Sequence, residues 1–227
     1  MQLERVVVSV DIACFALAGE RLMLLLVERA EPPFAGSWAL PGGAVQPDEP
    51  LGAAAARLLA ERTGIQNDQA YLEQLYTFGD PGRDPRGRTL SVTYFALLSA
   101  AQEAPVRAGR GVQDVAWWPA DGLPPLAFDH DRIAAYARRR LAQKLSYTPL
   151  AFHVLPETFT LGDLRTLYEA VERRRYDPSN FPKQMLARWD LAPVPGVRDR
   201  RTRRPARLYR YIGPRQIAGP PETLEEP

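Results

Sequence analysis

The sequence lacks most of the features that stabilise or anchor exported proteins. Its 227 residues include one cysteine, Cys14, so no disulfide can form within the chain, and this cysteine is expected to be buried in an apolar strand. No apolar run reaches the ~20 residues that span a bilayer. The N-terminal residues lack the basic start and the small-residue cleavage site of a secretory signal. These absences predict a cytoplasmic protein with no membrane partner.

Positive charge is sparse in the first two thirds of the chain and concentrated after it. Residues 1–144 carry 15 Lys and Arg against 17 Asp and Glu, whereas residues 145–213 carry 13 against 7. Residues 214–227 are rich in proline and glutamate and are predicted to form a disordered tail. An excess of positive charge in one block predicts a module that meets a polyanion, although a solvated basic face without a partner has the same composition.

A glycine-rich turn and an Ala/Leu-rich helix, predicted over Leu51–Thr63, lie between Gly43 and Ile65. This segment resembles the Nudix box, G-x5-E-x7-R-E-U-x-E-E-x-G-U, in which U is a bulky aliphatic residue. The residues on matching positions are Gly43, Glu49, Arg57, Leu59, Glu61, Gly64 and Ile65. An ordinary turn and helix would account for a surface pair such as Arg57 and Glu61, but not for the whole set of spacings.

Two positions depart from the box. Leu58 stands where the family has its first helical glutamate, and Arg62 stands where it has its last. In working Nudix enzymes, the resemblance implies, these glutamates hold a divalent metal on a pyrophosphate. Positions 58, 61 and 62 share one helix face, and Mg²⁺ requires oxygen ligands, so Glu61 beside these two side chains makes a poor metal site. The sequence therefore predicts a nucleotide-diphosphate pocket that has no catalytic residues and needs no metal, with Glu49, Arg57 and Glu61 as the residual box.

An active Nudix hydrolase, cleaving ADP-ribose or another nucleoside diphosphate derivative, remains the alternative. Its Mg²⁺ would need an unusual shell made of Glu49, Glu61 and a further carboxylate such as Glu73 or Asp80. The replaced glutamates at positions 58 and 62 argue against this alternative.

The first part of the chain alternates predicted strands and helices in the manner of an α/β protein. Apolar residues at helical spacing predict a helix over Asp131–Leu145 that closes this part. Strands are predicted at Val6–Leu17, Arg21–Glu28, Leu90–Leu98 and Val112–Trp118. Together with the Nudix resemblance, this order implies an α/β/α sandwich with a mixed sheet, assigned to residues 1–145.

Residues 146–213 have a separate pattern. A short helix is predicted from Pro149 to Leu155, a second from the N-cap Thr160 to Glu172, and a third from the N-cap Ser179 to Trp189, with Pro182 in its first turn. A hairpin is predicted to follow, with strands Leu191–Val197 and Arg207–Ile212. Three short helices and a basic hairpin are the layout of a winged helix-turn-helix.

The third helix of this layout would enter the major groove of DNA. Its candidate DNA-binding residues are Ser179, Asn180, Lys183, Gln184 and Arg188, because amide and basic side chains read base edges or hold phosphates. The wing adds candidates for phosphate contacts at Arg200, Arg201, Arg203 and Arg204. A small helical packing domain with a merely solvated basic loop is the alternative.

The combination of the degraded box with this second module resembles the Nudix-related transcriptional regulators, whose best-known members repress genes of NAD synthesis. Further matching segments are 126–130, 159–161, 180–181 and 204–206. The resemblance implies ADP-ribose or a related nucleotide as effector, and a homodimer on a palindromic double-stranded DNA operator. Pro182 departs from the basic residue expected after Asn180-Phe181. A non-regulatory protein that binds ADP-ribose and dimerises through the basic module is a further alternative.

The resemblance also places the effector pocket. The segments that form it in relatives contain Arg29, Phe34, Trp38, Gly42, Gly43, Arg57 and Arg62. Arg62 is expected to offset phosphate charge in place of a metal. The arginine-rich loop 80–88 adds Arg83, Arg86 and Arg88 as further groups for phosphates, although its Gly and Pro content also fits an ordinary exposed loop. Asp129 and His130 are expected to cap the closing helix without a further role.

Overall fold

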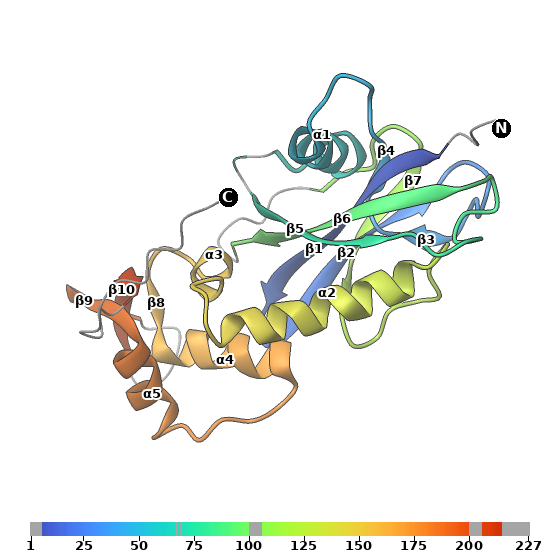
Figure 1. Cartoon of the computed structure of the whole chain (residues 1–227). Coiled ribbons are helices and arrows are strands. Elements are labelled where there is room, and N and C mark those ends of the chain that lie inside the picture. Colours follow the sequence, from blue (N-terminus) through green and yellow to red (C-terminus); the bar gives the residue numbers. More distant parts are fainter. Residues whose placement is uncertain (1–5, 67, 69, 100–105, 200–205, 215–227) are drawn as a thin grey trace.

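A mixed sheet of seven strands forms the first part of the protein, for which a computed structural model describes residues 6–66, 68, 70–99, 106–199 and 206–214 (Figure 1). The strands are β1 (Val7–Ala18), β2 (Arg21–Arg29), β3 (Trp38–Ala39), β4 (Gly42–Ala44), β5 (Ala70–Phe78), β6 (Thr89–Leu98) and β7 (Val112–Pro119). They follow the order β3-β2-β1-β6-β5, while β4 pairs with β1 and β7 pairs with β2. The β1–β6 pair is parallel and the other pairs are antiparallel.

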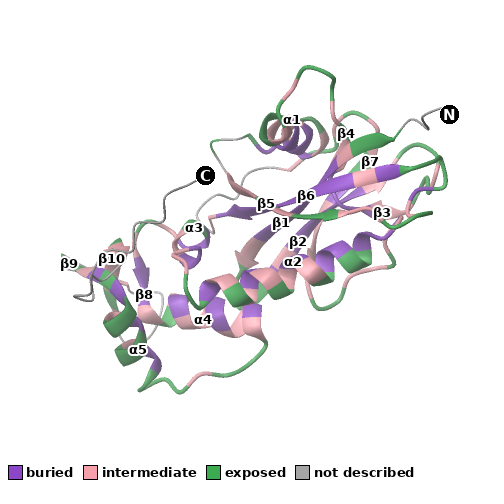
Figure 2. Cartoon of the chain, in the orientation of Figure 1, coloured by how far each residue is buried: buried purple, intermediate pink, exposed green. Residues whose placement is uncertain are grey.

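Alternating side chains explain why helices cover both faces of this sheet. Val10 and Ile12 of β1 pack in the same cluster as α1 (Leu51–Thr63), whereas Phe15 packs in the cluster that contains α2 (His130–Leu145). This follows because successive side chains of a strand point to opposite faces. Figure 1 shows α1 and α2 on opposite sides of the sheet, and Figure 2 shows buried residues on the strands between them. The predicted α/β/α sandwich with a mixed sheet is confirmed.

The loop that precedes β7 packs around the C-terminal end of α1 and fixes its position. Gly64 ends the helix in the left-handed conformation, with φ 81°, and donates its N–H to the carbonyl of Ala60 at 2.9 Å. The backbone N–H groups of Gly109 and Arg110 donate to the carbonyls of Arg62 and Glu61, each at 3.2 Å. These contacts satisfy carbonyls that a helix end leaves without partners, and they place the loop directly beside Arg62.

A three-stranded sheet and three short helices form the second part. Its elements are α3 (Ala151–Val154), β8 (Phe159–Thr160), α4 (Leu161–Glu172), α5 (Phe181–Arg188), β9 (Trp189–Asp199) and β10 (Ala206–Pro214), with the sheet order β8-β10-β9. The predicted cap of α4 is present: the Asp163 N–H donates to the Thr160 hydroxyl at 3.0 Å, and the Asp163 carboxylate accepts the Thr160 N–H at 2.8 Å. This arrangement is the predicted winged helix-turn-helix.

The start of α5 differs from the prediction, because Ser179 is not its N-cap. The Asp177 carboxylate instead accepts the N–H groups of Ser179 and Asn180 at 3.0 and 2.7 Å, and the Asp177 carbonyl accepts the N–H of Phe181. A carboxylate that takes two N–H groups outcompetes a single hydroxyl for these donors. The turn of residues 178–180 therefore lies before the helix.

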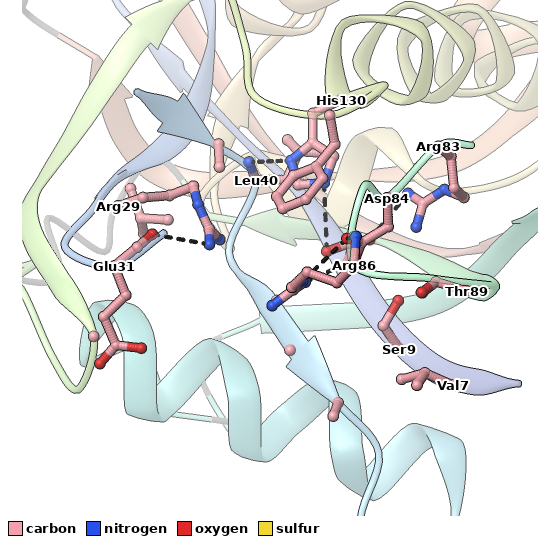
Figure 3. A pocket seen from close by; sticks show the side chains of 18 of the residues that line it. Val7, Ser9, Arg29, Glu31, Leu40, Arg83, Asp84, Arg86, Thr89 and His130 are labelled. Atoms are coloured by element: carbon pink, nitrogen blue, oxygen red, sulfur yellow. Dashed lines mark hydrogen bonds and ion pairs between the residues drawn. The ribbon is translucent and has the colours of Figure 1, made fainter. Parts of the chain in front are cut away.

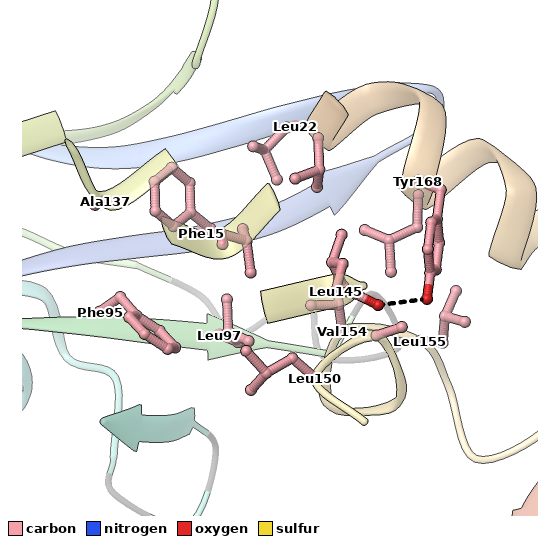
Figure 4. Close-up of a cluster of buried hydrophobic side chains, with 14 of the residues drawn as sticks. Phe15, Leu22, Phe95, Leu97, Ala137, Leu145, Leu150, Val154, Leu155 and Tyr168 are labelled. Carbon is pink, nitrogen blue, oxygen red and sulfur yellow. Dashed lines mark hydrogen bonds between the residues drawn. The ribbon is translucent and has the colours of Figure 1, made fainter. Parts of the chain in front are cut away.

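The hydrophobic core of the second part is continuous with that beneath the sheet. Leu141 and Leu145 of α2 pack in one buried cluster with Leu164 and Tyr168 of α4, and the Tyr168 hydroxyl donates to the Leu145 carbonyl at 2.8 Å (Figure 4). Helix α2 thus belongs structurally to both parts, since its N-terminus lies at the sheet and its C-terminus lies in the winged helix. Every helix among the described residues is too short or too polar to cross a bilayer.

Candidate functional site

A cavity of about 440 Å³ opens where β1, β4 and the loop between β5 and β6 meet the start of α2 (Figure 3). Its volume lies within the ~300–1,000 Å³ that is typical of small-molecule sites. Ser9 and Asp11 of β1 line one wall, and Gly42 and Gly43 bring the backbone of β4 close to it. A Cβ on Gly42 would lie 2.2 Å from Oδ1 of Asp11, so this position requires glycine.

Several arginines surround the cavity. Those that line it are Arg29, Arg62, Arg83, Arg86 and Arg88, all of them predicted effector-binding residues. They come from β2, from α1 and from the loop of residues 79–88, so the fold brings together groups that are up to 59 positions apart in the sequence. They differ, however, in what already holds each guanidinium.

Arg29 and Arg62 are held by backbone carbonyls. The Nε–H of Arg29 donates to the Pro33 carbonyl at 2.8 Å, and the Nε–H of Arg62 donates to the Gly42 carbonyl at 3.2 Å. Arg62 also donates to the carbonyl of Arg110. Neither side chain forms an ion pair among the described residues, and burial lowers the pKa of both guanidinium groups. Both positive charges therefore face the cavity without a neutralising carboxylate.

Arg83, by contrast, is committed to carboxylates. Its Nε–H and Nη2 donate to the two oxygens of Asp129 at 3.1 and 2.6 Å, and Nη2 lies 3.6 Å from Oδ2 of Asp11. The expectation that Asp129 and His130 only cap α2 is wrong. Asp129 forms no side-chain cap bond and pairs with Arg83 instead, while Nδ1 of His130 accepts the Leu40 N–H at 2.9 Å and the ring lines the cavity.

The loop arginines Arg86 and Arg88 are also engaged. Asp84 accepts two hydrogen bonds from the Arg86 guanidinium, at 3.0 and 2.7 Å, and these bonds lower the pKa of the Asp84 carboxyl. Arg88 donates to the carbonyl of Gly79. The loop is therefore organised by its own ion pair and hydrogen bonds before any ligand binds.

Two aromatic residues beside the cavity have strained backbones. Phe34 and Phe128 adopt left-handed conformations, with φ 63° and 58°, and their rings pack edge to face at 4.8 Å. The Arg29 guanidinium lies 4.9 Å from the centre of the Phe128 ring. Such strain, of the order of 1–3 kcal/mol per residue, persists where surrounding contacts over-determine the position, and it is concentrated at functional sites.

Three of the predicted effector-binding residues do not line the cavity. Phe34 reaches it only through the Phe128 ring. Trp38 packs on Trp118 with ring centres 5.5 Å apart. Arg57 lies on the outer side of α1, within the residual box.

The residual box neutralises itself. The Nε–H of Arg57 donates to Glu49 at 2.8 Å, and its Nη1 donates to Glu61 at 3.2 Å. The bonds from Arg57 lower the pKa of the Glu49 carboxyl to about 2. Leu58 is 1% exposed and packs into the core against Gly43, so it offers no metal ligand, and Arg62 places a positive charge beside it. This set of groups does not fit Mg²⁺.

The additional carboxylates considered for a metal shell are engaged elsewhere. Glu73 accepts from the Tyr71 hydroxyl at 2.8 Å and pairs with Lys144. Asp80 pairs with Arg132 at 2.5 Å. Within the described ranges, no three His, Cys, Asp or Glu side chains cluster as metal ligands do.

Helix α5 separates its residues into a buried and an exposed face. Phe181 and Met185 are buried, at 1% and 3% exposure, beside Trp189 of β9. The candidates Ser179, Asn180, Lys183, Gln184 and Arg188 are all exposed, as is Ala187. The wing candidates Arg200, Arg201, Arg203 and Arg204 lie outside the described residues.

The sequence patterns miss Asp11, a buried group that lines the cavity, and its buried partner Ser91. They are 7% and 0% exposed, and the Ser91 hydroxyl donates to Oδ2 of Asp11 at 2.5 Å. The signal for Asp11 is present in hindsight, since it is a lone charged residue within an apolar strand and buried charges need partners. Its partners, however, lie 72 and more positions away.

Comparisons with known proteins agree with this architecture. Residues 7–163 match the NUDIX domain family, and residues 151–211 match the NrtR DNA-binding winged helix domain. The ADPR responsive transcriptional repressor NtrR of Acinetobacter baylyi is 35% identical over 96% of this chain and 87% of its own length. The crystal structure of Shewanella oneidensis NrtR in complex with a 27mer DNA is similar with a TM-score of 0.77 and 35% identity, covering 90% of this chain and 93% of that one.

A second structure concerns the first part alone. The NUDIX domain of Shewanella oneidensis NrtR, in a complex with ADP ribose, is similar with a TM-score of 0.56 and 40% identity, covering 61% of this chain and 90% of that one. A Nudix sheet with a basic cavity, joined through α2 to an NrtR-type winged helix, identifies this chain as a member of the NrtR family of Nudix-related transcriptional regulators.

Proposed function

We propose that this protein is a DNA-binding transcriptional regulator that responds to ADP-ribose or a closely related nucleotide. Residues 1–145 form the effector-binding part and residues 146–213 the DNA-binding part, acting as a homodimer on a palindromic operator. The observation that carries the proposal is the pair Arg29 and Arg62, whose charges face the cavity without carboxylate partners among the described residues.

A diphosphate is the anion that this pair fits. A guanidinium binds phosphate oxygens with charge-assisted hydrogen bonds, which are roughly twice as strong as neutral ones. Arg62 lies at the box position where the Nudix pattern has a glutamate, and it offers to a phosphate the positive charge that a metal would otherwise supply. Binding of the effector therefore needs no metal. The ADP ribose complex of the related Shewanella domain supports this choice of ligand.

Hydrolysis of the effector is not expected. Glu49 and Glu61 are tied to Arg57, and Leu58 is buried. Among the residues that the structure describes, no cluster of three His, Cys, Asp or Glu side chains stands near Arg62 to hold a metal. The protein is therefore a sensor of the nucleotide rather than an enzyme that consumes it.

The exposed face of α5 supports the DNA-binding role. Lys183, Gln184 and Arg188 lie on the solvent side of a helix whose other side is packed into the core, and a recognition helix requires this division. The Shewanella relative crystallised with DNA supports the same assignment. The proposal includes that the regulated genes belong to NAD metabolism or a related pathway.

The test uses the full chain, a duplex selected by the protein from a random library, and EDTA throughout. ADP-ribose should bind saturably in calorimetry and should change the affinity of the protein for the duplex in fluorescence anisotropy. A separate incubation with Mg²⁺ or Mn²⁺ in place of EDTA should produce no AMP at rates near about 1 s⁻¹, the low end for ordinary enzymes. Binding of ADP-ribose without any effect on DNA affinity would overturn the regulatory role, and metal-dependent turnover would overturn the sensor role.

A further inference from the structure

The wall of the cavity contains a second pair of polar groups besides the arginines. Asp11 and His130 are 7% and 4% exposed, and both line the cavity. Nε2 of His130 lies 3.7 Å from Oδ1 of Asp11. This separation is longer than the ~2.7–3.2 Å of a hydrogen bond, so the two groups stand beside each other without being joined.

The imidazole presents a proton to the cavity. Nδ1 of His130 accepts the N–H of Leu40 at 2.9 Å, so this nitrogen carries no proton. Burial lowers the pKa of His130, which keeps the ring neutral near pH 7. In a neutral ring the proton must then lie on Nε2, which makes that atom a hydrogen-bond donor.

The carboxylate presents an acceptor beside this donor. Oδ2 of Asp11 receives the hydroxyl of Ser91 at 2.5 Å and lies 3.6 Å from Nη2 of Arg83. Oδ1 receives no hydrogen bond from the described residues. Because Arg83 is itself clamped by Asp129, the carboxylate cannot rotate freely. Gly42 packs closely beside Oδ1, and a Cβ there would lie 2.2 Å from this oxygen, so only glycine leaves room for it.

We propose that Asp11 and His130 together bind one hydroxyl group of the ligand's sugar. The hydroxyl donates its proton to Oδ1 of Asp11 and accepts the Nε2–H of His130. A phosphate oxygen does not fit this place, because it has no proton to donate and the carboxylate repels it. The proposal rests on the proposed function, which supplies a nucleotide with sugar hydroxyls.

This pair supplies a selectivity that the arginines cannot. Arg29 and Arg62 attract any diphosphate, whereas a buried donor and acceptor are left unpaired when the ligand lacks the matching hydroxyl. Sites built in this way reject the deficient analogue far more strongly than apolar pockets do. The hydroxyl comes from the terminal ribose of ADP-ribose or from the ribose of its adenosine, and the two sources are separated below.

Two variants test the pair while preserving its surroundings. In Asp11→Asn, Ser91 and Arg83 hold the amide oxygen in the place of Oδ2, so an N–H group replaces the free acceptor. In His130→Asn, the amide oxygen takes the place of Nδ1 and still accepts the N–H of Leu40, but the Nε2 donor is lost. Matched controls are Asp121→Asn, at an exposed carboxylate paired with Arg21, and His153→Asn, at the second histidine of the chain, which stacks on Tyr71.

Affinities for ADP-ribose, ADP and pyrophosphate are measured in EDTA, by calorimetry or by competition, after thermal unfolding has shown that each variant is folded. Each cavity variant should bind ADP-ribose about 10- to 100-fold more weakly, the loss expected for a hydrogen bond to a charged or buried partner. Affinity for pyrophosphate, which has no sugar, should be unchanged, and so should the affinities of both controls for ADP-ribose.

The response to ADP identifies the source of the hydroxyl. An equal loss for ADP places the adenosine ribose at the pair, whereas an unchanged affinity for ADP places the terminal ribose there. Equal losses for all three ligands, or no loss for ADP-ribose in a folded His130→Asn protein, would overturn the inference and leave the proposed function intact. Failure of the unaltered protein to bind ADP-ribose would overturn the proposed function, and the inference with it.

Discussion

Helices α1 and α5 each carry polar residues along one face, but the two faces are prepared for different partners. On α1, Arg57 is tied to Glu49 and Glu61, and Arg62 turns its charge toward the cavity. On α5, Lys183 and Arg188 are exposed and form no ion pair among the described residues. Helix α1 thus places one charge that has no carboxylate partner, Arg62, at a defined position in the cavity. Helix α5 instead leaves a whole basic face exposed to a partner.

This difference matches the physics of the two anions. A small diphosphate is recognised by buried donors whose positions are fixed beforehand, because electrostatic interactions are strong where water is excluded. DNA is a long polyanion, so an exposed basic surface gains affinity from many weak, screened contacts and releases counterions when it binds. The two positions of positive charge, at the cavity and on the exposed face of α5, therefore match the two anions that we propose for them.

The largest effect is expected from Arg62→Glu, which puts back the carboxylate of the Nudix pattern. Its charge would face the bound diphosphate, and the loss of a charge-assisted hydrogen bond together with repulsion should weaken ADP-ribose binding in EDTA about 100-fold or more. Calorimetry measures the change. The exposed Arg107→Glu, which makes the same change in net charge nearby, is the control and should bind normally.

The same experiment in Mn²⁺ sharpens the comparison. If Arg62 stands in for a cation, metal should recover part of the binding of Arg62→Glu and should add nothing to the unaltered protein. Unchanged binding by this variant in EDTA would show that the charge on this face of α1 does not serve the diphosphate.

Substitutions on α5 should act on DNA alone. Gln184→Ala or Arg188→Ala should leave folding and ADP-ribose binding intact and cost about 1–3 kcal/mol of discrimination at one operator position. Anisotropy with matched and single-mismatch duplexes measures this cost. Ala187, exposed on the same helix, supplies the control Ala187→Ser. If the variants at positions 184 and 188 weaken binding to all DNA sequences equally, α5 does not read bases.

Lowering the pH should reduce the free energy of unfolding through the buried histidine of the cavity. Burial lowers the pKa of His130, so between that folded value and the ordinary value of about 6.5 the unfolded chain binds the extra proton. This contribution to stability is complete above the unfolded pKa and falls as pH decreases below it, by at most about 1.4 kcal/mol per pH unit for one proton.

Denaturant unfolding between pH 7 and pH 5 checks this expectation, and His130→Asn should flatten the dependence. Burial also lowers the pKa of His153 in α3. The variant His153→Asn therefore measures how much of the pH dependence comes from that histidine instead. An undiminished slope in His130→Asn would show that the cavity histidine is not the group being protonated.

The smallest effects are expected in the wing. Arg201→Ala or Arg203→Ala should weaken binding to specific and random duplexes alike, and should reduce the slope of log affinity against log salt by about one unit for each phosphate that is no longer bound. A salt series with both duplexes measures the slope. A change of sequence preference in the wing variants, with none in the α5 variants, would reverse the two assignments.

Local patterns were sufficient for much of the architecture. The alternation of apolar residues in β1, the Ala/Leu run of α1 and the Thr160–Asp163 cap of α4 each report on neighbours within a few positions, and each was predicted. β3, β4, β5 and β8 were not predicted, and β3 and β4 have only two and three residues. β5 is a half-exposed strand at the end of the sheet, with an irregular register near Leu75, and β8 has only two residues. Neither a half-exposed strand nor one this short leaves a clear alternation of apolar residues in the sequence.

The amino-acid sequence alone determined two features of this chain. One is a Nudix-type helix that lacks the first and the last glutamate of the box, and the other is a basic second module. Both are properties of spacing and charge. Only the tertiary structure decided what each charge does. Arg83 meets Asp129 across 46 positions, and Leu40 meets His130 across 90. Such contacts depend on how the strands and α2 come together in space, and no local period encodes them. That is why Arg83, expected to hold phosphates, is bound to carboxylates, while Asp11 and His130 form part of the cavity wall.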